Sequence, residues 1–173
     1  MDRRKFLIRS SLWVGAVSAS GFYWVHRWHY IVIHHSAGNY GNIEFLQKVH
    51  RQRQAGDPID AIPYHYIIGN GNGLGMGIVN SDWRNDYKLW GMHVSANNVD
   101  RNYRGVGICL VGNYEKQSVP ELQYQSLLAL TKNLMATYSI GPNHVTGHGH
   151  TDGESTKCPG RFFPMERFKK EIS

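Results

Sequence analysis

The sequence predicts a single α/β domain in which helices flank a central mixed β-sheet. The segment from Tyr30 to His35 is apolar and β-branched on both faces, which is typical of a central strand covered on two sides. Strand and helix patterns follow one another along the chain, in the order β, α, β, β, β, α, loop, α. The 173 residues are 41% hydrophobic, which is enough for one substantial core but scarcely for two.

The first half of the chain supplies most of the predicted sheet. Apolar residues at helical spacing predict a helix from Ile43 to Gln54, ended by Gly56. Two short apolar runs, Tyr64 to Ile68 and Leu74 to Val79, flank Asn-Gly pairs and predict an antiparallel hairpin. We expect the polar segment 81–104 to be a loop that forms part of a cleft wall.

A buried strand at 106–111 is followed by the helical part of the chain. Ser118 opens a capping-box pattern with Pro120 in the first turn. The helix that follows is expected to bury an apolar face of Leu122, Leu127, Leu130 and Leu134 and to end before Gly141. A histidine-rich connection then leads to a final short helix from Pro164 to Ile172.

Residues 1–25 have the pattern of an export signal or an N-terminal anchor. Arg3 and Arg4 precede an apolar stretch that contains small residues, which resembles a twin-arginine signal, although Asp2 stands where serine or threonine is usual. The apolar stretch is shorter than the roughly 20 residues of a membrane-spanning helix. Cleavage and retention as an inner-membrane anchor both remain open. We expect residues 26–173 to form the functional domain, exported to the periplasm or cell envelope.

Charge and cysteine content exclude some classes of protein. The formal charge of +6 falls when the N-terminal arginines and lysine are discounted, and no basic run interleaved with aromatic residues suggests nucleic-acid binding. Two cysteines are too few for a disulfide framework. Cys109 lies in the apolar strand 106–111 and is expected to be a buried hydrophobic residue.

Two motifs near opposite ends of the chain carry the chemistry. Ile33-His34-His35-Ser36-Ala37, with one of its two histidines, and the segment from His150 to Gly160, with His150 and Cys158, can together supply two imidazoles and one thiolate. Structural zinc sites usually use four protein ligands, whereas catalytic sites use three and leave a position for water. Because only one cysteine lies near these histidines, we expect an open, three-ligand zinc site in a surface groove.

The chain resembles the zinc-dependent N-acetylmuramoyl-L-alanine amidases, a family shared by phage-type lysozyme amidases and peptidoglycan recognition proteins, over roughly Tyr30 to Ile172. The order and spacing of several motifs carry this resemblance. They are Ile33-His34-His35-Ser36-Ala37, Tyr64-His65-Tyr66-Ile67-Ile68, Gly91-Met92-His93, the segment from Gly105 to Tyr114, Gly147-His148-Gly149-His150 and Cys158-Pro159-Gly160.

The resemblance implies a ligand set for the zinc ion. The family's first ligand lies two residues before the serine, which selects His34 over its neighbour His35. Its last two ligands are commonly separated by seven residues, which selects His150 and Cys158, with His148 as the alternative to His150. Asp152 is a candidate for orienting the loop or a ligand.

The resemblance also implies roles for residues around the metal. Zinc lowers the pKa of its bound water to roughly 7 and polarises an amide carbonyl. Tyr64 matches the family's tyrosine that stabilises the oxyanion, and Thr156 matches a position that is lysine or threonine among relatives. His93 is expected beside the substrate groove, as a residue that contacts the substrate. His50 is expected on an exposed helix face.

These implications favour hydrolysis of the amide between N-acetylmuramic acid and L-alanine in peptidoglycan or muropeptides, by a monomeric enzyme that contains Zn²⁺. A peptidoglycan-binding module without catalytic activity is the alternative, and non-catalytic family members generally lack the ligand cysteine. A third hypothesis, a structural zinc domain, requires a fourth protein ligand, for which His148 is the nearest candidate.

Overall fold

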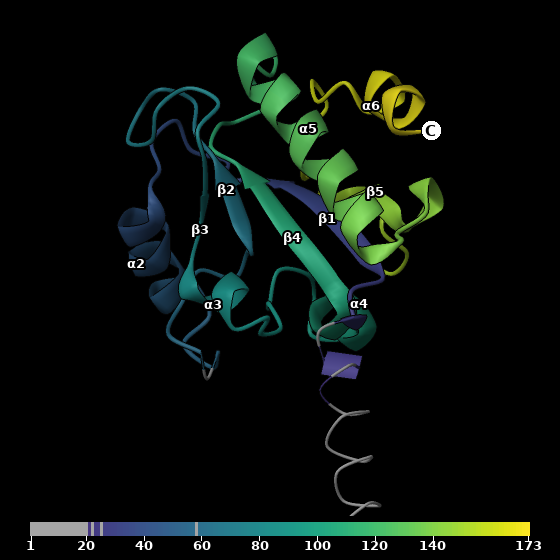
Figure 1. Ribbon diagram of the computed structural model, residues 1–173. Coiled ribbons are helices and arrows are strands. Elements are labelled where there is room, and N and C mark those ends of the chain that lie inside the picture. The colour runs from purple at the N-terminus through teal and green to yellow at the C-terminus, as the bar shows by residue number, and fades with distance from the viewer. Residues whose placement is uncertain (1–20, 22, 25, 58) are drawn as a thin grey trace, which may run out of the picture.

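The computed structural model describes residues 21, 23–24, 26–57 and 59–173. Five strands form one sheet in the order β3-β2-β4-β1-β5. Figure 1 shows this sheet with α2 on one side and α5 crossing the other. The strands β1, β2, β4 and β5 run parallel to one another, and β3 pairs antiparallel with β2. The predicted fold class, a central mixed sheet flanked by helices, is confirmed.

Strand β1 (Tyr30–His35) has the predicted bounds and pairs with β4 (Gly105–Leu110) and β5 (Val145–Gly147). Side chains alternate between the two faces of a strand. Ile33 therefore enters the main core, whereas His34 points to the opposite face beside Cys109, its register partner on β4. The strand thus carries a core residue and a functional candidate at consecutive positions.

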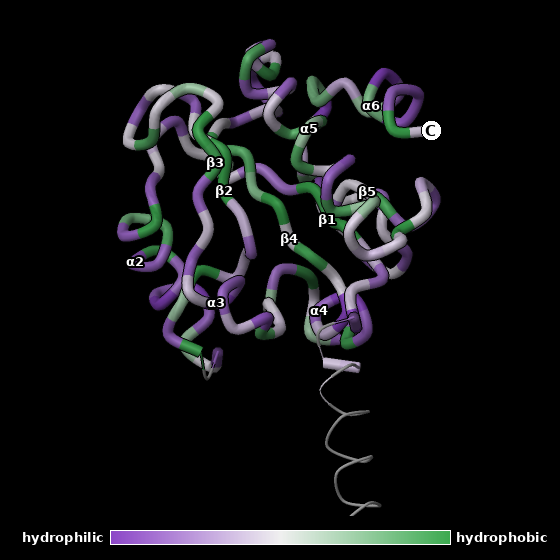
Figure 2. The backbone as a smooth tube through the Cα atoms, viewed as in Figure 1, coloured by the Kyte–Doolittle hydropathy of each residue, from purple (hydrophilic) through white to green (hydrophobic). Residues whose placement is uncertain are grey.

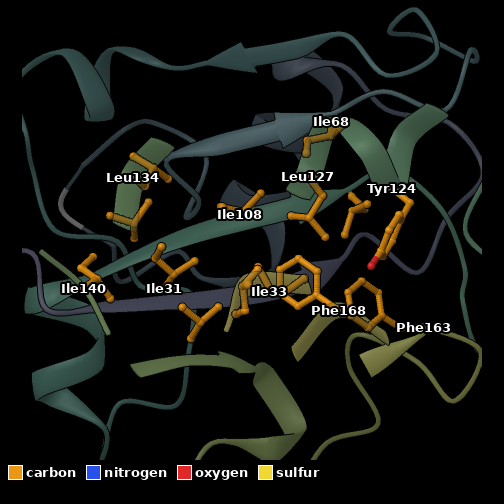
Figure 3. Packing of buried hydrophobic residues seen from close by; sticks show 14 of the residues in the cluster. Ile31, Ile33, Ile68, Ile108, Tyr124, Leu127, Leu134, Ile140, Phe163 and Phe168 are labelled. Carbon is orange, nitrogen blue, oxygen red and sulfur yellow. The ribbon is translucent and has the colours of Figure 1, made fainter. Parts of the chain in front are cut away.

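The main core fills the space between the sheet and the two helices α5 (Glu121–Tyr138) and α6 (Met165–Ile172). Figure 3 shows its packing: isoleucines of the strands meet leucines of α5, and Phe168 of α6 stacks edge-on against Phe163 and Tyr124. Figure 2 shows hydrophobic residues along the central strands β4 and β1 and in β2. The core fixes the position of β1 on this face.

Two details of α5 differ from the sequence prediction. The helix begins after Pro120 without a side-chain cap, so the expected Ser118 capping box does not form. Leu127 and Leu134 are buried as predicted, and Leu130 packs partly against the core, but Leu122 is exposed. Leu122 lies on the face of the first turn that is turned away from the core, since Gln123 and Tyr124 in the same turn are buried.

Helix α2 (Ile43–Arg53) covers the other face of the sheet and is capped by the side chain of Asn42, which accepts a hydrogen bond from the Phe45 N–H at 2.9 Å. Leu46 packs there with Ile67 and Cys109. His50 was expected to be exposed but is buried, because its Nε2 lies 2.9 Å from the buried Asp57 carboxylate. Arg84 binds the same carboxylate and fastens the segment after α2 to the domain.

An antiparallel hairpin is present, but its strands differ from the prediction. Strand β2 (Tyr66–Ile68) is shorter than expected, and β3 (Val79–Ser81) begins where the second predicted run ends. The segment after it is not an unbroken loop but contains the short helices α3 (Trp83–Asp86) and α4 (Val99–Arg104). The histidine-rich connection contains β5 between the 3-10 turns η1 (Pro142–His144) and η2 (His148–His150). These short elements had no hydrophobic periodicity by which to recognise them.

Most of the expected export or anchor segment lies outside the described residues. Within the described residues, no helix combines the length and the apolar character that are needed to cross a membrane.

Candidate metal centre

Three side chains converge where β1 and β5 end. The potential ligand atoms of His34, His148 and Cys158 all lie within 4.8 Å of one another, and they form the one group of this kind among the described residues. Ile33 of β1 pairs with Gly147 of β5, so the parallel strands deliver His34 and His148 to the same edge of the sheet. Their ring centroids are 4.7 Å apart.

Cys158 reaches this edge from the loop before α6. Its Sγ lies 3.7 Å from His34 Nδ1 and accepts a hydrogen bond from the His35 N–H at 3.3 Å. The backbone of the same loop is tied to η2, because the Gly149 N–H donates to the Cys158 carbonyl at 2.6 Å. A Cβ on Gly149 would lie 2.1 Å from the Thr156 carbonyl oxygen. Glycine is therefore required at position 149 for η2 to approach the backbone of the Cys158 loop.

His150 is not a member of the group: the sequence-based set was His34, His150 and Cys158, whereas the structure brings together His34, His148 and Cys158. His148 and His150 lie two residues apart in a 3-10 turn, which advances about 120° per residue. The two side chains therefore point in different directions. His150 is exposed and lines a separate surface depression with Gly160 and Arg161.

Strand alternation places the side chain of His34, and not that of His35, in this group. The His35 side chain points to the other face, where its Nδ1 accepts a hydrogen bond from the Tyr114 N–H at 3.1 Å. Only its backbone N–H contacts the Cys158 sulfur. His35 is thus a neighbour of the ligand group and not part of it.

The donor set fits a zinc ion. Two imidazoles and one thiolate are ligands that Zn²⁺ prefers, and three protein ligands are typical of a catalytic site. The 3.7 Å between His34 Nδ1 and Cys158 Sγ is close to the about 3.6 Å expected for two ligands of a tetrahedral zinc ion. Burial raises the pKa of the Cys158 thiol to about 12, against the lowering effect of the His35 N–H. The thiol must therefore lose a proton when it binds a metal.

A second imidazole lies behind His34. His93 Nε2 is 3.2 Å from the Gly105 carbonyl, which can only accept, so Nε2 carries the proton. Burial lowers the pKa of His93 to about 4, so the ring is neutral and Nδ1 is an acceptor. His34 Nε2 then donates to His93 Nδ1 at 3.1 Å, and His34 Nδ1 keeps its lone pair on the side of Cys158.

His93 was expected to contact substrate. It borders the groove, but it is buried and both of its ring nitrogens are engaged by His34 and Gly105. Gly107 makes room for the ring, since a Cβ at this position would lie 2.8 Å from the Cγ of His93. The structure therefore places His93 where it orients His34.

Among the described residues, the acidic residue that contacts a candidate ligand is Glu154, which the sequence did not single out. Its Oε2 lies 3.0 Å from His148 Nε2. Asp152, the expected candidate, is exposed, and its carbonyl accepts a hydrogen bond from Asn98 Nδ2 at 3.0 Å. An acidic residue between two candidate ligands in one loop was the available sequence signal.

Tyr64 and Thr156 both line the groove beside the ligand group. The Tyr64 ring is half-buried, and its centroid is 5.0 Å from that of His34. Burial raises the pKa of Tyr64 well above its ordinary value, so the phenol stays neutral and can donate a hydrogen bond. The Thr156 hydroxyl is exposed and accepts a hydrogen bond from the Cys158 N–H at 3.2 Å.

The groove has a volume of about 290 Å³. It is lined by Leu46, Val49, His50 and Arg53 of helix α2, and by the three candidate ligands together with Tyr64 and Thr156. Arg53 is the one permanently charged side chain among the described residues that line it. A groove with one guanidinium and no carboxylate favours an anionic ligand.

The fold and this site together define an α/β domain with a three-ligand candidate metal centre in a surface groove. Residues 24–161 match the family model Amidase_2, N-acetylmuramoyl-L-alanine amidase, and the chain belongs to this family.

Known proteins of similar sequence and structure agree with this assignment. Peptidoglycan-recognition protein SC2 of Drosophila melanogaster is 28% identical over 160 residues, which cover 89% of this chain and 80% of the relative. The structure of the N-acetylmuramoyl-L-alanine amidase LysC from Clostridium intestinale matches with a TM-score of 0.67 at 28% identity, covering 86% of this chain and 87% of LysC. A mutant of Drosophila PGRP-LB in complex with tracheal cytotoxin shares the fold, with a TM-score of 0.55 at 21% identity and coverage of 79% and 78%.

Proposed function

We propose that this protein is a zinc-dependent amidase that hydrolyses the bond between N-acetylmuramic acid and L-alanine in peptidoglycan and releases the stem peptide. The observation that carries the proposal is the convergence of His34, His148 and Cys158 in a groove that Tyr64 also lines. The family model and the similarity to LysC support the reaction class.

His34, His148 and Cys158 would hold the zinc ion. When bound, Zn²⁺ supplies Lewis-acid activation of water and of the amide carbonyl. Tyr64 donates a hydrogen bond to the oxygen that becomes negative as the amide is attacked, because its phenol is neutral and adjoins His34. Oriented donors of this kind are worth several kcal/mol, about 10²–10³ in rate.

Thr156 supplies a second polar contact at the rim of the groove. Its oxygen accepts from the Cys158 N–H, so its O–H remains free to donate to the substrate. A threonine carries no positive charge and is not acidic, so the proton that the leaving L-alanine amine requires comes from another group. Arg53 suits a carboxylate of the stem peptide.

The substrate class, the location and the membrane association belong to the same proposal. The complex of PGRP-LB with tracheal cytotoxin supports a muropeptide as a ligand of this groove. The basic and apolar composition of residues 1–25 supports export to the cell envelope, with association of the protein at the inner membrane if this segment is retained.

The proposal is tested by incubating the zinc-loaded full chain with purified muropeptides and intact peptidoglycan, beside Cys158→Ala. Mass spectrometry should detect free peptide that begins with L-alanine, with the wild type alone. If the zinc-loaded wild type binds muropeptide but releases no peptide from any substrate, the protein is a recognition module and the enzymatic proposal is wrong.

A further inference from the structure

Glu154 places a buried carboxylate next to the candidate metal centre. Its side chain is only 4% exposed, although it belongs to the loop between His148 and Cys158. Burying a carboxylate is costly unless hydrogen bonds replace the water that it loses. The structure supplies such bonds from two segments that are distant from each other in the sequence.

The first segment precedes helix α4. The Ser95 N–H lies 3.1 and 3.2 Å from the two carboxylate oxygens, and the Ser95 hydroxyl donates to Oε1 at 2.8 Å. Asn98 Nδ2 lies 3.2 Å from the same Oε1. The Asn98 amide also donates to the Asp152 carbonyl. Glu154 thereby fastens the loop that carries two candidate ligands to a separate part of the domain.

The second partner of the carboxylate is His148, whose Nε2 lies 3.0 Å from Oε2 of Glu154. An ionised carboxylate can only accept hydrogen bonds, so His148 Nε2 must carry the proton. The ring nitrogen left with a lone pair is Nδ1. His93 imposes the same arrangement on His34, so both imidazoles keep Nδ1 free for a metal.

We propose that Glu154 is a positioning residue of the metal centre, which fixes the tautomer of His148 and holds the 148–158 loop so that the ligand group is assembled before the metal binds. This role rests on the proposed zinc site and concerns metal binding, not contact with substrate. Carboxylate partners of ligating histidines in other proteins typically change metal affinity by about 10–100-fold.

The geometry predicts the effect of Glu154→Gln in detail. Three donors surround Oε1, namely the Ser95 N–H, the Ser95 hydroxyl and the Asn98 amide. The glutamine carbonyl therefore occupies the Oε1 position, and the NH₂ group takes the Oε2 position facing His148. Because NH₂ donates, His148 Nε2 must then accept, and the imidazole proton moves to Nδ1, where it blocks the metal.

The matched control is Asp152→Asn. It removes the same charge from the same loop, but the Asp152 side chain is exposed and its contact with Asn98 is through the backbone. This variant should leave the His148 tautomer and the zinc affinity unchanged. It therefore separates the specific contact from a general loss of negative charge near the metal.

Two measurements on the full chain test the proposal. Long-range ¹H–¹⁵N NMR of the metal-free protein should show His148 as the Nε2–H tautomer in the wild type and in Asp152→Asn, and as the Nδ1–H tautomer in Glu154→Gln. Competition with a chelator should show a loss of about 10–100-fold in zinc affinity for Glu154→Gln alone. Thermal unfolding checks that each variant is folded.

The outcomes separate this proposal from the proposed function. If the wild type binds zinc tightly and Glu154→Gln matches it in both tautomer and affinity, the role of Glu154 is wrong while the metal centre stands. If the folded wild type binds no zinc, the metal centre is wrong and the role of Glu154 falls with it.

Discussion

The Nε2 atom of His34 lies 3.1 Å from the Nδ1 atom of His93, so a candidate metal ligand is held from behind by a second buried imidazole. The chain of hydrogen bonds runs from His34 through His93 to the Gly105 carbonyl on β4. Strand β4 thus helps to orient a side chain of the neighbouring strand β1. Such partners of metal ligands fix both ring orientation and tautomer.

Replacing His93 tests this arrangement. His93→Leu removes the acceptor for the His34 N–H and should weaken zinc binding about 10–100-fold. His93→Gln can accept from His34 through its carbonyl and donate to Gly105 through its amide, so it should retain most of the affinity. Equal zinc affinity of His93→Leu and wild type, measured against a chelator, would show that His34 does not need this partner.

Gly107 gives a second, independent test of the same packing. A Cβ at this position would lie 2.8 Å from the His93 ring, so Gly107→Ala should displace the ring, destabilise the fold by about 1–3 kcal/mol and weaken zinc binding. Gly141→Ala is the control, because a Cβ there would meet nothing within 4 Å and the change should be within about 0.5 kcal/mol. Urea unfolding measures both variants, and equal destabilisation would contradict the packing argument.

Zinc uptake should release a proton from Cys158. The thiol is protonated in the metal-free protein because burial raises its pKa to about 12, and burial keeps His34 neutral by lowering its pKa well below the ordinary value. The zinc affinity should therefore rise with pH, about tenfold per unit between pH 7 and 9. Calorimetry in buffers of different ionisation enthalpy counts the proton. The expected release should disappear in Cys158→Ser, and its absence in the wild type would exclude Cys158 as a thiolate ligand.

Arg53 should contribute to the binding of an anionic substrate. Arg53→Gln removes the permanent charge of the groove and should raise KM about 2- to 5-fold, with little change in kcat, as expected for an exposed charge pair. Arg51→Gln, on the same helix, removes a guanidinium that is bound to Asp60 and should leave KM unchanged. Steady-state kinetics with a muropeptide decides the matter, and a similar KM for both variants would argue against a role for Arg53.

The docking of α6 onto α5 predicts an acid-sensitive ion pair. Arg167 donates to Glu121 at 2.7 and 2.8 Å, and this contact lowers the pKa of Glu121 to about 2. Because the folded-state pKa is lowered, the pair stabilises the fold above the unfolded value near 4.5, and this contribution is lost as pH falls through about 2. An NMR titration should give this value in the wild type and a value nearer 4.5 in Arg167→Gln.

The strands β1, β2 and β4 and the long helices were predictable because their signals are local, whereas β5 was missed and β3 was displaced from its predicted position. Tyr30–His35 was predicted with its observed bounds, since an apolar, β-branched run identifies a central strand. The helix α2 was predicted to within one residue of its end. The helices α3 and α4 were missed because four and six residues are too few to establish a periodicity.

The candidate site depended on contacts that no local pattern contains. Counting residues back from Cys158 selected His150, but the 3-10 turn and the pairing of Gly147 with Ile33 present His148 instead. The burial of His50 depends on Asp57, which lies beyond the end of the helix. The burial of Glu154 could not be predicted from the sequence, because its carboxylate is bound by Ser95 and Asn98, which lie in a distant part of the chain.

The central claim is that His34, His148 and Cys158 hold a catalytic zinc ion, and the two neighbouring histidines offer the most direct test. His148→Ala and His150→Ala should be purified as full chains, and both zinc content and release of L-alanyl peptide from muropeptide measured. We expect His148→Ala to lose zinc and activity and His150→Ala to retain both. Retention of zinc and activity by His148→Ala, with their loss in His150→Ala, would contradict the site described by the structure.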